Sequence, residues 1–185
     1  MFGKTNVKVR PNAKKSPIYY VTYIESTGTQ WIDTEYAIKN GDTVEICFQA
    51  TSVPSSGESW VYATWGSDPA YFRCGFSNSA FDTTRGFTYS QTADKTAKTI
   101  GIGKSTVDTT LTAYLFSQHE SSGAVHTANS KYKLYYCKIY NSGGSLVHDF
   151  RPCRDDSGVY CLYDEVLKAY FYNAGSGSFT GGASI

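Results

Sequence analysis

The chain has few of the features that mark several large protein classes. Charged side chains make up only 18% of its 185 residues and the net charge is +1, which is not the balance of a nucleic-acid-binding protein. No stretch is long and apolar enough to span a bilayer, so membrane insertion is not expected. No run keeps helical periodicity over three turns, while an apolar fraction of 41% argues against disorder. The sequence therefore predicts a folded protein that is poor in helix.

Patterns for catalysis and metal binding are also missing. A glycosidase needs two carboxylates placed across one groove, and no string of alternating acidic residues of that kind occurs. His119, His126 and His148 lack the sequence context of a nucleophilic serine, and no dense calcium-binding loop is present. The sequence therefore predicts a protein that is not an enzyme, with no catalytic residues, no metal site and no cofactor. Calcium bound by Asp149, Asp155, Asp156 and Asp164 is the alternative, and ordinary turn and cap roles are the expectation for these residues.

The chain has five cysteines, an odd number, and no two of them have the CxxC spacing of a metal-ligand pair. Cys47 and Cys137 lie in apolar strand patterns, where a free thiol behaves as a small core residue. We expect buried free thiols. The main alternative is a disulfide between Cys153 and Cys161.

Aromatic residues are abundant: the chain has 16 Tyr, 10 Phe and 3 Trp, together with 17 Gly. This composition favours many strands joined by tight turns. Two runs, 131–140 and 145–151, flank a loop that contains two glycines, which indicates a β-hairpin. Residues 43–50 alternate well and place Val44, Ile46 and Phe48 on the inner face.

The two faces of the run 131–140 are less clear. Tyr132, Leu134 and Tyr136 fall two apart and share one face of an extended strand, while Cys137 and Ile139 fall on the other. Either both faces are covered, or a bulge swaps them.

The whole pattern predicts an all-β protein with a two-sheet antiparallel jelly-roll sandwich, because short strands recur about every ten residues. Expected loops include a polar one at 117–130. The further expected strands and loops are strands at 18–24, 29–34, 60–65, 70–76, 81–90, 97–103, 107–116, 159–163 and 169–172, and loops at 52–59 and 152–157.

Residues 1–17 form a separate basic, polar arm, and residues 18–185 the sandwich domain. The arm holds no apolar core of a secretory signal, so we expect a protein made in a cytoplasm. The arm is either a disordered terminus or an anchor that orders on a partner, and the alternation at 7–10 would suit strand addition to a partner's sheet edge. The expected anchoring residues are Lys4, Lys8, Arg10, Lys14 and Lys15.

Residues 23–34, YIESTGTQWIDT, resemble an opening motif of the form YIESTGTQYIDT in concanavalin A-like (laminin-G-like) jelly-roll domains of gut bacteria and their phages. The runs 138–140, 146–153, 158–164 and 171–179 follow the closing pattern of that family. The resemblance spans Tyr23 to Phe179 and implies a lectin-like sandwich with an extended N-terminal arm. Related domains serve as carbohydrate-binding modules, adhesion domains and virion components, and the fold also hosts glycoside hydrolases.

The resemblance and the basic arm together favour a non-enzymatic structural or decoration protein of a phage virion. In this interpretation the arm attaches to a capsid or tail protein and the jelly roll faces outward, where it adheres to host or mucosal glycans. The alternative is a carbohydrate-binding or adhesion module of a bacterial surface protein. The oligomeric state stays open, with a homo-oligomer such as a trimer among the expectations.

Sugar binding requires exposed aromatic rings to cover pyranose faces, with polar groups nearby for the hydroxyls. These residue types gather in the middle third of the chain. The alternative is that the aromatic residues fill the core, and Trp60, Tyr62 and Phe76 suit that role. The predicted glycan-binding residues are Trp60, Trp65, Tyr71, Arg73, Asp82 and Arg85.

Overall fold

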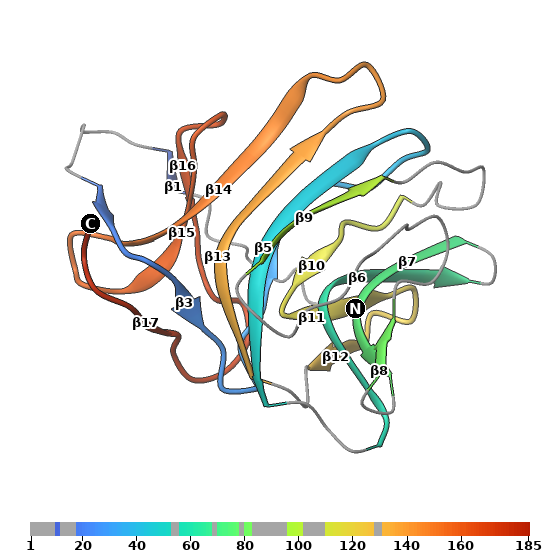
Figure 1. Cartoon of the computed structure of the whole chain (residues 1–185), viewed down its shortest axis with the longest axis horizontal. Helices are drawn as coiled ribbons and strands as arrows, with labels where there is room; N and C mark the ends of the chain where they lie inside the picture. Colours follow the sequence, from blue (N-terminus) through green and yellow to red (C-terminus); the bar gives the residue numbers. More distant parts are fainter. Residues whose placement is uncertain are drawn as a thin grey trace, which may run out of the picture.

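The computed structural model describes residues 10–11, 18–52, 56–67, 70–77, 80–82, 96–101, 110–127 and 131–185. Within these ranges the chain is all-β, and its strands form two sheets (Figure 1). The prediction of a two-sheet all-β protein is therefore confirmed. In the same ranges, no helix is long and apolar enough to cross a membrane.

The first sheet runs in the order β1-β16-β15-β14-β13-β3-β17, and β5 also pairs with β13 and β9, while β2 pairs with β14. All of these pairings are antiparallel. The strands are β1 (Arg10–Pro11), β2 (Tyr19–Tyr20), β3 (Ile24–Glu25), β5 (Thr43–Ser52), β9 (Thr96–Gly101), β13 (Lys131–Tyr140), β14 (Leu146–Arg154), β15 (Tyr160–Asp164), β16 (Ala169–Phe171) and β17 (Thr180–Gly181).

The second sheet runs in the order β12-β11-β6-β10-β4, with β7 on β6 and β8 on β7. Its pairings are antiparallel except that β11 runs parallel to β6. The strands are β4 (Ile32–Asp33), β6 (Glu58–Ser67), β7 (Ala70–Ser77), β8 (Ala80–Asp82), β10 (Tyr114–Leu115), β11 (Ser117–Glu120) and β12 (Val125–Thr127).

One hydrophobic core is shared by both sheets, which makes the fold sandwich-like. Val44, Ile46 and Phe48 of β5 point into it, as the alternation predicts. From the second sheet the core receives Tyr62 of β6 and Phe76 of β7, so the interpretation of these two aromatic residues as core is also confirmed.

The predicted hairpin is confirmed as β13 and β14, which pair from Cys137–Phe150 to Tyr140–Leu146. The register of β13 against β5 shifts between Leu134 and Tyr136, so a bulge interrupts the alternation. As a result Leu134 and Cys137 are both fully buried, whereas Tyr136 is only half-buried. Of the two alternatives left by the sequence, the bulge is therefore the one found.

Several of the expected boundaries are wrong. β6 begins at Glu58, inside the expected loop 52–59, and the expected strands 18–24 and 29–34 shrink to the short strands β2, β3 and β4. Residues 83–90 and 102–103, at the ends of two further expected strands, lie outside the described residues. The segment 117–130 is not only a loop, because it contains the hairpin of β11 and β12; its polar residues are ladder-bonded, and Ser117 and Gln118 are buried. The expected loop 152–157 begins later, since β14 continues to Arg154. Of the expected strand 107–116, the described part contains only Tyr114–Leu115, and residues 107–109 lie outside the described residues.

The five cysteines are free and buried, which confirms the expectation of core thiols. Cys153 and Cys161 face each other across β14 and β15 with their Sγ atoms 3.5 Å apart, and they form no disulfide. Aromatic rings enclose the pair, among them Tyr163 and Tyr170. Burial raises the pKa of the Cys74 thiol, so this thiol is held in the protonated form.

Candidate functional site

Four of the six residues predicted to bind glycans come together on the adjacent strands β6 and β7. We call Trp60, Trp65, Tyr71 and Arg73 the aromatic–arginine cluster. The Trp65 and Tyr71 rings are stacked with centroids 4.5 Å apart. The Arg73 guanidinium carbon lies 4.0 Å from the Trp65 ring centroid, 4.9 Å from that of Trp60 and 5.2 Å from that of Tyr71. Such contacts are attractive because the ring faces carry negative charge density.

The alternation of β7 places this cluster on the outer side of the second sheet. Phe72, Cys74 and Phe76 belong to the shared core, so the residues between them face away from it. Gly75 lies opposite Trp60, and a Cβ atom at this position would come within 2.2 Å of the Ser59 carbonyl oxygen. Only glycine therefore fits at this position beside Trp60.

Strand β11 supplies the polar partners of the cluster. The Nε of Arg73 donates to Gln118 Oε1 at 3.0 Å, and Gln118 Nε2 donates to Glu120 Oε1 at 3.0 Å. On the other side, Arg73 Nη1 lies 3.3 Å from Glu58 Oε1. The sequence reasoning missed Gln118 and Glu120 because β11 lies in a segment expected to be a polar loop and reaches β6 only through the parallel pairing. It missed Glu58 because this residue falls in the expected loop 52–59 and not in a strand.

Exposure differs sharply within the cluster. Trp60 is 1% exposed and Tyr71 is 8% exposed, so these two rings are not available as platforms for a sugar. Trp65 and Arg73 are half-buried, and Glu58 is exposed. Trp60 is therefore buried, as the alternative to glycan binding predicts, but its side chain is not part of the core shared by the two sheets. What a ligand can reach is the exposed part of the Trp65 ring and the Glu58 carboxylate, with the Arg73 side chain, 14% exposed, beside them.

The other predicted site residues are placed only in part. Asp82, the last residue of β8, pairs with Gly75 of β7. Arg85 lies outside the described residues. Arg10 lies in β1, which pairs with β16 of the chain's own first sheet. The expected anchors Lys4, Lys8, Lys14 and Lys15 also lie outside the described residues.

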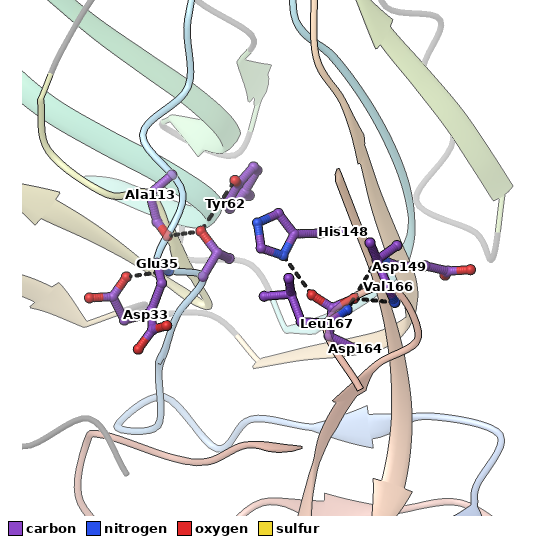
Figure 2. A network of polar contacts seen from close by, with 10 residues as sticks. Asp33, Glu35, Tyr62, Ala113, His148, Asp149, Asp164, Val166 and Leu167 are labelled. Atoms are coloured by element: carbon purple, nitrogen blue, oxygen red, sulfur yellow. Dashed lines mark hydrogen bonds and ion pairs between the residues drawn. The ribbon is translucent and has the colours of Figure 1, made fainter. Parts of the chain in front are cut away.

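A second polar group is enclosed between β14, β15 and the turn that follows (Figure 2). His148 Nδ1 lies 2.6 Å from Asp164 Oδ2, and the His148 ring stacks on Phe150. Asp164 Oδ1 also accepts the backbone N–H groups of Asp149 at 3.1 Å and Val166 at 2.9 Å. Asp164 is fully buried and His148 is 6% exposed, so this pair joins neighbouring strands and faces no solvent.

The environment of Asp164 changes its acidity. Burial by itself raises the pKa of this carboxyl group, but the hydrogen bonds from His148 and from the backbone N–H groups of Asp149 and Val166 outweigh burial and lower the pKa below its ordinary value. The carboxylate form is thereby stabilised in the folded protein. The arrangement suits a structural role for the histidine, as single histidines on strands usually have.

The described part of the chain contains no group of three or more His, Cys, Asp or Glu side chains that could hold a metal ion. No family model matches the chain, and no curated protein or solved structure shows significant similarity to it.

Proposed function

We propose that this protein is a non-enzymatic structural or decoration component of a phage particle, whose concanavalin A-like jelly roll adheres to glycans. The support for the fold is the two-sheet architecture with one shared core, together with the sequence motifs at both ends of the sandwich. The observation that carries the function is the aromatic–arginine cluster.

The cluster has the chemistry that glycan binding needs. The partly exposed Trp65 ring offers an apolar face for the C–H groups of a pyranose. Arg73 and the exposed Glu58 lie beside it and can exchange hydrogen bonds with sugar hydroxyls, because one is a donor and the other an acceptor. The buried rings of Trp60 and Tyr71 contact the Arg73 guanidinium and hold it in place.

The particle half of the proposal rests on the resemblance to phage and gut-bacterial domains and on the cationic arm. A capsid or tail protein would be the partner of the arm, and the virion its location. The pairing of Arg10–Pro11 with β16 shows that this part of the arm takes an extended form at a sheet edge. The same form is the one required for strand addition to a partner.

The glycan half is tested with the full chain on a glycan array. We expect binding to a defined set of glycans, and we expect Trp65→Ala to weaken it at least about tenfold, because the loss of one stacking ring removes roughly 1.4 kcal/mol or more. Leu167→Ala is the matched control, since Leu167 is 52% exposed and lies in the turn between β15 and β16. Absence of any ligand, or binding that Trp65→Ala leaves unchanged, would refute this half.

The particle half is tested by deletion of residues 1–17. We expect the truncated protein to be absent from purified particles while its melting temperature stays close to that of the full chain, because β1 contributes only two residues to the first sheet. Full incorporation of the truncated protein would show that the arm is not the anchor. Failure of the full chain to enter particles would favour the bacterial surface module instead.

A further inference from the structure

A cleft of about 410 Å³ opens between the β14–β15 turn and the segment that joins β16 to β17. It shares no residue with the aromatic–arginine cluster. Its volume lies within the range of about 300–1,000 Å³ that is usual for small-ligand pockets. The residues that matter most for its chemistry are Asp155, Val159, Tyr160, Tyr172, Asn173 and Ser178.

One wall of the cleft is the β14–β15 turn, and Asp155 fixes its shape. Asp155 Oδ1 accepts the backbone N–H groups of Ser157 and Val159, each at 2.9 Å. Gly158 adopts a φ of 79°, which an L side chain rarely allows. The wall is therefore set before any ligand arrives.

The other wall is fixed in a similar way by Asn173. Its Oδ1 accepts the backbone N–H groups of Trp31 at 3.2 Å and Gly175 at 2.9 Å, and its Nδ2 donates to the Gly177 carbonyl oxygen at 2.9 Å. The Tyr172 hydroxyl donates to Asp155 Oδ2 at 3.1 Å, which ties this wall to the first. A preformed cleft loses little conformational entropy when a ligand binds.

The lining combines apolar and hydroxyl-binding surface. Tyr160 and Tyr172 are half-buried and Val159 is 47% exposed, so together they present apolar area to a ligand. Ser178 adds an exposed hydroxyl group, and Asp155 adds carboxylate lone pairs beyond those already in use. These are the groups that bind the C–H faces and the hydroxyls of a sugar.

The charge of the residues that line the cleft further limits the classes of ligand that it can bind. Asp155 is the single charged residue that lines the cleft, and it disfavours anions such as phosphates or sialic acid. Within the described residues no metal-type cluster of acidic, His or Cys side chains occurs that would recruit a cation. We infer that the cleft binds one neutral hexose unit of a glycan, and this inference takes its class of ligand, though not its location, from the proposed function.

The test is a titration of the ¹⁵N-labelled full chain with three methyl glycosides, those of α-mannose, β-galactose and α-glucose. We expect at least one of them to shift the amide signals of Gly175 and Gly177 saturably, with a Kd of about 1–10 mM, as is typical when a small ligand makes few contacts. No shift of these signals with any of the three probes would overturn the inference.

Two matched variants locate the binding. Ser178→Trp places a large ring in the cleft from an exposed position and should weaken the titration at least tenfold, whereas Ser176→Trp, in the same segment but outside the lining, should not. Trp65→Ala should leave the titration unchanged. If Ser178→Trp does not weaken the binding seen in the titration, the hexose does not bind in the cleft and the inference is refuted. Array binding that Trp65→Ala removes would in that case still support the proposed function.

Discussion

The His148–Asp164 pair and the aromatic–arginine cluster are both polar groups set on strands, but their partners differ in kind. Asp164 is bound by backbone N–H groups as well as by His148, and nothing of it reaches solvent. Arg73 is bound only by side chains and rings in the described part of the chain, and Glu58 beside it is exposed.

Backbone partners and side-chain partners give the two regions different freedom to rearrange. Backbone donors cannot turn away without unfolding of the strands, so the carboxylate of Asp164 is fixed for as long as the fold exists. Side-chain partners can change rotamer, so Glu58 can give up its bond to Arg73 when a ligand hydroxyl takes its place. The first region therefore serves stability and the second is suited to exchange with a ligand.

The largest effect is expected for Asp164→Asn, which tests whether the His148–Asp164 pair serves stability. An amide cannot accept as many hydrogen bonds as the carboxylate does, and His148 is left without its buried partner, so we expect a loss of about 3–5 kcal/mol in the free energy of unfolding. Urea denaturation of the purified protein measures it. Asp156→Asn, at an exposed turn position, should change stability by less than about 0.5 kcal/mol. Equal effects of the two substitutions would contradict a structural role for Asp164.

A smaller effect is expected for Gln118→Ala. Gln118 is 1% exposed and bridges Arg73 to Glu120, so its removal leaves buried polar groups without a partner and should cost about 1–3 kcal/mol. Ser121→Ala, at an exposed position of the adjacent turn, is the control for thermal unfolding. Because the Arg73 guanidinium would lose one of its supports, glycan binding should fall as well. Unchanged stability would show that β11 does not organise the cluster.

The smallest expected effect concerns the free energy of unfolding at acidic pH, compared between the wild-type protein and Asp164→Asn. The pKa of Asp164 is lowered in the folded state from an ordinary value of 3.8, so its contribution is fully present above pH 3.8 and is lost as the pH falls through the lower folded-state pKa. We expect the free energy of unfolding of the wild-type protein to decline below pH 3.8 more steeply than that of Asp164→Asn. Parallel curves for the two proteins in urea titrations at successive pH values would show that Asp164 is not stabilised as an anion.

The sequence predicts best what is local. The hairpin of β13 and β14 follows from two apolar runs around a glycine loop. Trp65 lies opposite Tyr71 because β6 and β7 are consecutive strands that pair antiparallel. What it could not predict depends on distant pairing. Gln118 reaches Arg73 only because β11 lies parallel to β6, and no local signal in a polar segment indicates such a pairing.

Bulges limit prediction in a different way. One extra residue near Tyr135 moves Cys137 and Ile139 to the core side of β13, and simple alternation cannot give its position. The cleft beside Asp155 was missed for a third reason: its walls come from a turn and a glycine-rich segment that only the closed fold brings together.

The pairing of β5 with β13 has a consequence for how the chain is made. β3 and β5, near the start of the chain, take their places beside a strand that ends at Tyr140. On the ribosome β5 therefore cannot pair with β13 until Tyr140 has emerged, and apolar residues of β5 such as Ile46 stay uncovered by that strand until then. Expression at low temperature or with chaperones should raise the yield of native protein for this reason.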